Sequence, residues 1–127
     1  MNDWLDIKGK TVLVTGASSG IGKAIVEELL ELGVNVANFD LSDNDLRHPN
    51  LLFVKVDVTS RSEVEAGVAK IVERFGNIDA VVNNAGINVP RLLIDAENPK
   101  GPYELDDETF EKVTMINQKG LYLVSQA

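Results

Sequence analysis

Short apolar runs alternate along this chain with stretches whose apolar residues recur at helical spacing. Runs at residues 11–15, 35–39, 51–56 and 80–83 are predicted strands, and the first is nearly all apolar, as a strand covered on both faces should be. The helical stretches follow the first, third and fourth of these runs. Strands that alternate with helices are typical of βαβ units. The pattern therefore predicts an α/β fold built on a doubly wound parallel sheet.

Three helices are predicted from the spacing of the apolar residues. The second begins at a capping box formed by Ser60 and Glu63 and ends at Gly76. The third begins at Asp106, which can cap it, and runs to the end of the sequence without a stop signal. The residues expected on the buried stripes are Ile21, Ile25, Leu29 and Leu32, then Val64, Val68, Ile71 and Phe75, then Phe110, Val113, Ile116 and Val124. We therefore expect residues 1–127 to form a single domain, in a βαβαβαβα order, that is incomplete at its C-terminal end.

A glycine-rich segment, Thr15-Gly16-Ala17-Ser18-Ser19-Gly20-Ile21-Gly22, joins the first predicted strand to the first predicted helix. Its glycines permit a tight turn that lets backbone amides approach a pyrophosphate, and the following helix offers free N–H groups and the positive end of its dipole. A tight connection without a ligand is the structural alternative, and a Walker A loop is excluded because Ala24 stands where it needs Ser or Thr. Its position predicts a dinucleotide-binding turn of the Rossmann type. The candidate cofactor-binding residues here are Gly16, Ser18, Ser19, Gly20, Ile21 and Gly22.

Asp40 closes the second predicted strand, 18 residues beyond Gly22. A carboxylate about 20 residues beyond such a turn accepts hydrogen bonds from the adenosine ribose hydroxyls. The same carboxylate repels a 2′-phosphate, and the next residues, Leu41-Ser42-Asp43, add acid rather than a base. A surface aspartate at a strand end is the alternative. The pattern predicts NAD as the cofactor, rather than NADP.

Composition and charge exclude several other functions. The net charge of −8 opposes general attraction to nucleic acid or to an anionic membrane. No apolar run approaches the roughly 20 residues of a membrane span, and the acidic start differs from a secretory signal, so we expect a cytoplasmic protein. Without cysteine there are no disulfides or cysteine-based zinc sites, and His48 is the only histidine, so no metal site is expected.

The pattern Thr-Gly-x-x-x-Gly-x-Gly at residues 15–22 resembles the fingerprint of the short-chain dehydrogenase/reductase family, and three later segments resemble that family in the same order. Asp57-Val58-Thr59 resembles the segment whose aspartate contacts the adenine and whose valine lies against it. Asn83-Asn84-Ala85-Gly86 resembles the motif that ends the fourth strand beside the cofactor. Asn117 matches the asparagine of the catalytic tetrad. The resemblance therefore adds the candidate cofactor-binding residues Asp57, Val58, Asn84, Ala85 and Gly86 and the candidate catalytic residue Asn117.

Asn117 also has a structural interpretation. It is predicted on the same helical face as Val113 and Val124, where a polar group on an otherwise apolar stripe needs hydrogen-bond partners. A structural asparagine bonded to nearby backbone is therefore the alternative to a catalytic role. In the family, this asparagine holds a water that links the active-site lysine to solvent, so its implied role is to support other groups.

The resemblance implies an NAD-dependent oxidoreductase acting on an alcohol or ketone. In the family a tyrosine acts as acid and base, a lysine four residues later lowers its pKa, and a serine orients the substrate. Neither tyrosine here fits, because Tyr103 is followed four places on by Asp107 and Tyr122 by Gln126. The isolated 127-residue chain is therefore expected to be inactive. A non-catalytic protein that binds NAD or modulates the assembly of a relative is the alternative, and an extended-type epimerase is disfavoured by its different glycine spacing.

Residues 1–4, 88–93 and 103–127 resemble members of the family that act on a polyol phosphate. The loop from Gly86 to about Leu105 is suited to substrate contact. Arg91 in this loop can offer a bidentate fork to a phosphate, and a solvated loop charge is the equally open alternative. The resemblance implies the family's sheet order, 3-2-1-4-5-6-7, in which a chain that stops after the helix following the fourth strand leaves the strand at 80–82 as a bare edge. The isolated chain is therefore expected to be poorly soluble or partly unfolded. The resemblance also implies a homo-oligomer, a dimer or tetramer, for the full-length protein.

Overall fold

The computed structural model describes residues 4–127. Residues 1–3, which belong to one of the segments resembling polyol phosphate dehydrogenases, lie outside the described residues. The strands are β1 (Thr11–Thr15), β2 (Asn35–Asp40), β3 (Leu51–Lys55) and β4 (Ala80–Val82). The helices are α1 (Gly20–Glu31), α2 (Arg61–Phe75), α3 (Asp107–Thr114) and α4 (Gly120–Gln126), with a π-helical turn, η1 (Met115–Lys119), between the last two. Each predicted strand is present, and β3 and β4 each end one residue earlier than predicted.

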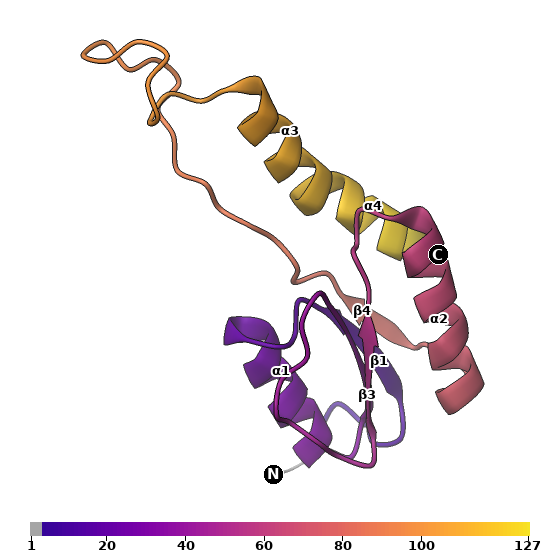
Figure 1. Cartoon of the computed structure of the whole chain (residues 1–127). Helices are drawn as coiled ribbons and strands as arrows, with labels where there is room; N and C mark the ends of the chain where they lie inside the picture. The colour runs from indigo at the N-terminus through magenta and orange to yellow at the C-terminus, as the bar shows by residue number, and fades with distance from the viewer. Residues whose placement is uncertain (1–3) are drawn as a thin grey trace.

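The four strands form one parallel sheet in the order β3-β2-β1-β4 (Figure 1). β1 pairs with β2 along its whole length, from Thr11 opposite Asn35 to Thr15 opposite Phe39, and its other edge pairs with β4. The chain therefore extends the sheet first to one side of β1 and then to the other. Such a reversal opens a crevice at the carboxyl ends of the strands. The α/β, Rossmann-type architecture predicted from the sequence is confirmed, and the order of these four strands is the one that the resemblance implies.

Two apolar clusters cover the two faces of the sheet. One joins the sheet to α2 and α4 and includes Phe39, Ile71 and Val124. The other joins the sheet to α1 and includes Val14 and Val26. Figure 1 shows α1 and α2 on opposite sides of the strands. Successive residues of a strand contribute to opposite clusters, which is why the strands read as continuous apolar runs.

The buried face of α1 differs from the predicted one by one residue. Gly22, Val26 and Leu30 are buried, whereas Ile25 lies only at the edge of the cluster. Ile21 leaves 76% of its surface exposed, so its prediction as a core residue is wrong. The physical reason is that Gly22 occupies the point of closest approach to the sheet, where there is no room for a side chain.

The start of α2 follows its predicted capping box with one difference. The Ser60 hydroxyl accepts a hydrogen bond from Glu63 N at 3.4 Å and so satisfies one N–H left free at the helix start. The Glu63 carboxylate accepts from Asp57 N at 3.3 Å rather than from Ser60 N, which donates to the Asp57 carbonyl. The helix start is thereby tied to Asp57, one of the candidate site residues.

The helix predicted from Asp106 onward is divided by η1. It begins where predicted, because the Asp106 carboxylate accepts a hydrogen bond from Thr109 N at 2.7 Å, and this bond lowers the pKa of Asp106. α3 and the loop before it extend away from the sheet (Figure 1), and α4 returns to the core, where it buries Val124. Phe110 is 59% exposed, so its prediction as a core residue is wrong. A π-turn shifts the side chains that follow it, and one continuous apolar stripe does not form.

β4 is a short outer strand of the described sheet, and its Val81 is 39% exposed. An outer strand presents unpaired backbone groups to which another strand can bind. Poor solubility of the isolated 127-residue chain stays a prediction on this ground.

Gly67 in α2 provides a test of how tightly the helix packs on the sheet. A Cβ on Gly67 would stand 2.7 Å from Phe39 Cζ and 2.9 Å from Val56 Cγ2, and Phe39 is fully buried. Overpacking costs about 1–3 kcal/mol, whereas alanine gains about 1 kcal/mol of helix propensity over glycine. The difference between the two terms predicts that Gly67→Ala lowers the free energy of unfolding by up to about 2 kcal/mol, measured by urea denaturation. Ala66→Gly, at an exposed position of the same helix, gives the propensity term alone, and a stabilised Gly67→Ala protein would contradict the packing argument.

Candidate functional site

A cleft of about 390 Å³ opens where the carboxyl ends of β1, β2 and β4 meet the start of α1. Its volume lies within the roughly 300–1,000 Å³ typical of small-molecule sites. The residues that line it are Gly16, Ser19, Ile21, Phe39, Asp40, Leu41, Val56, Asp57, Val58, Asn84, Ala85, Gly86, Ile87 and Ile116. Of the predicted site residues, Ser18, Gly20, Gly22 and Asn117 are not among this lining. The structure thus brings most of the candidates from distant parts of the sequence to one place.

The glycine turn follows a backbone path that other residues rarely adopt. Gly16 and Gly20 have φ values of +64° and +57°. At Gly16 a Cβ would also stand 2.8 Å from Ala85 Cα, so the turn lies directly against the end of β4. At Gly20 nothing lies within 4 Å of the Cβ position, so there the left-handed backbone alone requires glycine.

The first turn of α1 is suited to hold an anion. A Cβ on Gly22 would stand 2.5 Å from Asn84 Nδ2, so the helix begins as close to the strand ends as its backbone allows. The first N–H groups of a helix have no acceptor within it, and within residues 4–127 the Ser19 side chain makes no capping bond to them. This turn carries no acidic residue, which leaves the positive end of the dipole unopposed. Ile21 adds an exposed apolar surface to the cleft, and the whole arrangement fits a pyrophosphate.

Asp40 ends β2 at the rim of the cleft, and backbone N–H groups fix its carboxylate. Its Oδ2 accepts from Ser18 N at 3.0 Å, and its Oδ1 accepts from Leu41 N at 2.7 Å and from Ser42 N at 3.5 Å. A carboxylate oxygen has two acceptor positions, so Oδ2 can accept a second hydrogen from a ligand hydroxyl. Asp40 therefore ties the glycine turn to β2 and presents an acceptor suited to a ribose hydroxyl.

Asp57 and Val58 lie beyond β3 and form another wall of the cleft. Asp57 Oδ1 accepts from both Thr59 N, at 2.9 Å, and Thr59 Oγ1, at 2.7 Å. Its Oδ2 carries no hydrogen bond from the described residues and can accept one from a ligand. Val58 is buried, and Gly120 of α4 lies so close that a Cβ there would stand 2.8 Å from Val58 Cγ2. An apolar wall beside a free acceptor suits an adenine ring with its amino group.

Asn84 and Ala85 hold the end of β1. The backbone N–H groups of both residues donate to Thr15 Oγ1, at 3.1 and 3.0 Å. Asn84 Nδ2 also donates to the carbonyls of Thr15 and Gly16, at 3.1 and 3.0 Å. These groups lie at the end of the strand ladder, where the backbone needs other partners. Asn84 thus supports the glycine turn as well as lining the cleft.

Asn117 lies in η1 and binds the chain just beyond Gly86. Its Oδ1 accepts from Ile87 N at 2.9 Å, and its Nδ2 donates to Ile87 O at 2.8 Å. The hydrogen-bond partners that Asn117 needs are therefore backbone groups, as the alternative of a structural asparagine predicted. Asn117 is exposed rather than set in an apolar stripe, so that part of the prediction is wrong. Its place in a π-turn, rather than in a regular helix, is the reason.

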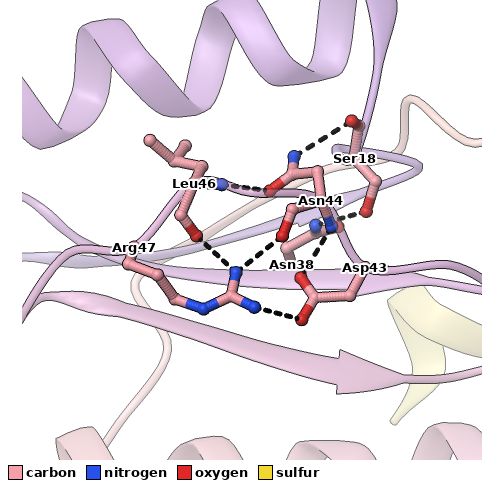
Figure 2. A network of polar contacts seen from close by, with 6 residues as sticks. All are labelled: Ser18, Asn38, Asp43, Asn44, Leu46 and Arg47. Atoms are coloured by element: carbon pink, nitrogen blue, oxygen red, sulfur yellow. Dashed lines mark hydrogen bonds and ion pairs between the residues drawn. The ribbon is translucent and has the colours of Figure 1, made fainter.

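The sequence analysis missed two asparagines, Asn38 and Asn44, that contact the glycine turn. Asn38 is 4% exposed, and its side chain accepts from Ala17 N at 3.1 Å and donates to Ser18 Oγ at 3.0 Å. Asn44 Nδ2 donates to Ser18 O at 2.9 Å. Figure 2 shows the two amides beside Ser18. The signal for Asn38 was an amide within an apolar, buried strand, since such a group needs partners. The sequence offers no comparable signal for Asn44, which lies in a polar loop.

A larger hollow, of about 520 Å³, lies along β3 and the loop before it and includes Arg47 and Phe53. The glycine turn, Asp40 and Asp57 all belong to the smaller cleft. Among residues 4–127 no group of three acidic, histidine or cysteine side chains could hold a metal ion, and no helix is both long enough and apolar enough to cross a membrane. We therefore place the candidate site in the smaller cleft.

Comparison with known proteins agrees with the motifs. The family model described as short chain dehydrogenase matches residues 10–127. Sorbitol-6-phosphate 2-dehydrogenase of Klebsiella pneumoniae is 46% identical over 129 residues, which cover 100% of this chain and 48% of that protein. The chain spans about half the length of the curated relatives it matches.

Solved structures show the same fold. Aldohexose dehydrogenase of Thermoplasma acidophilum, in ligand-free form, matches with a TM-score of 0.81 and 30% identity over 95% of this chain and 43% of that one. 3-Ketoacyl-(acyl-carrier-protein) reductase of Brucella melitensis, solved in complex with NADH, matches with a TM-score of 0.79 and 27% identity over 95% of this chain and 49% of that one. With its glycine turn, its strand order and these matches, the chain belongs to the short-chain dehydrogenase family.

Proposed function

We propose that this protein is an NAD-dependent oxidoreductase that interconverts an alcohol and a ketone, with sorbitol 6-phosphate and fructose 6-phosphate as the substrate pair. The observation that carries the proposal is the cleft in which the glycine turn and Asp40 face the same space. Residues 1–127 supply the cofactor-binding domain, and the whole protein works as a cytoplasmic homo-oligomer.

The preference for NAD over NADP rests on Asp40. Ribose hydroxyls can donate to its carboxylate, whereas a 2′-phosphate would bring further negative charge against it. Arg47, a cation on the β2–β3 loop, binds Asp43 at 3.1 Å and the carbonyls of Asn44 and Leu46. These contacts hold it within its own loop, where it does not offset the charge of Asp40. The NADH bound to the Brucella relative supports the same choice.

Each part of the cleft takes one part of the nucleotide in this proposal. The turn at residues 16–22 and the start of α1 hold the pyrophosphate, Asp40 holds the ribose, and Asp57 with Val58 holds the adenine. Ala85 and Gly86 line the path toward the nicotinamide. When bound, NAD supplies the acceptor for the hydride that leaves the alcohol carbon. The residues of this chain bind and orient the nucleotide, and Asn117 holds Ile87 at the edge of the cleft.

The substrate class rests on the likeness to the Klebsiella enzyme and on the loop after β4. Loops at the carboxyl ends of parallel strands carry ligands in open α/β sheets. Here the loop closes on itself, because Leu92 N donates to Tyr103 O and Leu105 N donates to Leu92 O, both at 2.8 Å. Arg91, in the same loop, can form the bidentate contact with a substrate phosphate that a guanidinium favours.

Asp40→Asn tests the cofactor. Removing the charge weakens the hydrogen bonds to the ribose and the repulsion of a 2′-phosphate. Since hydrogen bonds to charged groups contribute about 1.5–3 kcal/mol, we expect the Kd for NAD to rise about tenfold or more while the Kd for NADP falls, measured by titration calorimetry. Asp45→Asn, at an exposed position of the β2–β3 loop, should leave both values unchanged. An unchanged ratio of the two Kd values in Asp40→Asn would exclude Asp40 as the discriminating group.

The substrate is tested by following NAD reduction with sorbitol 6-phosphate. We expect turnover by the protein isolated from its natural source and little with unphosphorylated sorbitol, because the phosphate supplies binding energy. No tyrosine in residues 1–127 has a lysine four places on, so this polypeptide alone should bind NAD without turnover. Equal rates with sorbitol and its phosphate would rule out a phosphate-binding substrate site.

Asn117→Ala tests how the chain beyond Gly86 is held. The variant loses both hydrogen bonds to Ile87, and one such bond contributes about 1 kcal/mol. We expect the Ile87 amide to exchange with deuterium about tenfold faster. Asn83→Ala, which loses a bond to Ser125 Oγ instead, is the control and should leave Ile87 unchanged. Equal protection of Ile87 in the wild type and Asn117→Ala would show that other contacts hold this segment.

A further inference from the structure

The amide of Asn38 can be oriented in only one way. Ala17 N is a donor, so the Asn38 atom 3.1 Å from it must be the oxygen, and the atom 3.0 Å from Ser18 Oγ must then be the nitrogen. An amide nitrogen donates and does not accept. Ser18 Oγ is therefore the acceptor in this pair, and its own hydrogen is left for another partner.

Ser18 is held through each of its polar atoms. Its N donates to Asp40 Oδ2, its Oγ accepts from Asn38, and its O accepts from Asn44 Nδ2. Asn44 is itself oriented, because its Oδ1 accepts from Leu46 N at 2.9 Å. Figure 2 shows the contacts of Ser18 with Asn38 and Asn44, and that of Asn44 with Leu46. Within residues 4–127 the Ser18 hydroxyl has no acceptor of its own.

The side chain of Asn38 stabilises the glycine turn rather than the strand that carries it. Its neighbours Ala37 and Phe39 are fully buried, and Val36 on the same face packs with the α1 cluster. An apolar side chain would suit the strand equally well and would leave no buried amide to satisfy. Both side-chain hydrogen bonds of Asn38 go to Ala17 and Ser18, in the turn that the proposed function assigns to the pyrophosphate and ribose.

We propose that Asn38 is a positioning residue for nucleotide binding, which holds the Ser18 hydroxyl so that its hydrogen is donated to an oxygen of the ribose–phosphate portion of the ligand. Ser18 is not itself part of the cleft lining, but it lies in the turn between Gly16 and Ser19, which line the cleft, and its N donates to Asp40, which also lines it. The turn then presents a fixed donor, the Ser18 hydroxyl, beside a fixed acceptor, the Asp40 carboxylate. The inference rests on the proposed function, because it concerns how the same cleft holds NAD.

A double-mutant cycle on NAD binding tests the proposal. Asn38→Asp keeps an acceptor for Ala17 N but replaces the donor, so that the Ser18 hydrogen is drawn to the new carboxylate. We expect Ser18→Ala to raise the Kd for NAD about fivefold to tenfold in the wild type, the effect of one hydrogen bond. In the Asn38→Asp background, where the hydroxyl no longer donates to the ligand, Ser18→Ala should change the Kd less than twofold. Such non-additivity is the mark of two residues acting through one contact.

Asn38→Val is made in parallel, because a buried carboxylate can prevent folding and valine suits an inner strand. Ser18→Ala should again have less than a twofold effect in this background. Asn35→Val, on the same strand, is the matched control, since the Asn35 side chain donates to Gly9 O and not to the turn. In that background, Ser18→Ala should keep its full effect.

The outcomes separate the inference from the proposed function. If the wild type binds NAD and Ser18→Ala raises the Kd by the same factor in every background, Asn38 is a structural residue and the inference is wrong. If Ser18→Ala has no effect in the wild type, the hydroxyl does not contact the ligand, and the inference is again wrong. If the wild type binds neither NAD nor NADP, the proposed function fails, and the inference fails with it.

Discussion

The backbone of the glycine turn lies beyond the end of β1, and two side-chain amides take the place of the strand neighbours it lacks. Asn84, from the end of β4, donates to the carbonyls of Thr15 and Gly16. Asn38, in β2, accepts from Ala17 N. Buried backbone groups are costly unless they are bonded, so the path of the turn is set by the two strands that flank β1. The rest of the site depends on this path.

The positions of the glycines follow from the same constraint. Since Asn84 binds the turn from one side, α1 begins so close to β4 that a side chain at Gly22 would meet the Asn84 amide, and one at Gly16 would meet Ala85. The close approach also brings the free N–H groups at the start of α1 to the strand ends, where the cleft opens. Packing between helix and sheet and the capacity to hold an anion are thus two consequences of one arrangement.

Periodicity predicted the strands and the existence of the helices, because a sheet covered on both faces leaves continuous apolar runs, whereas the order of the strands in the sheet came from the resemblance to the family. It failed where an apolar residue serves something other than the core. Ile21 fits the stripe of α1, yet it lies at the cleft, and spacing alone cannot separate the two places. The π-turn was not predicted because the contact that accompanies it, Asn117 with Ile87, joins segments 30 residues apart. The glycine turn and Asp40 were found from their spacing, whereas Asn38 was missed because its strand was read as an apolar run.

The net charge of −8 would disfavour an anionic ligand if it acted as a whole, but the cleft arranges charge locally. At physiological ionic strength, charges on the surface are screened beyond about 8 Å, so the groups that line the cleft matter most. The start of α1 carries no acidic residue. The two carboxylates at the cleft already accept hydrogen bonds, Asp40 from Ser18 N, Leu41 N and Ser42 N, and Asp57 twice from Thr59. Their remaining acceptor positions suit hydroxyl and amino groups, while the helix start suits phosphate. The start of α1 is thus a region of hydrogen-bond donors, and the two carboxylates form a region of acceptors. The bonds that the carboxylates accept from nearby residues and from the glycine turn keep these regions separate despite the net charge of the whole chain.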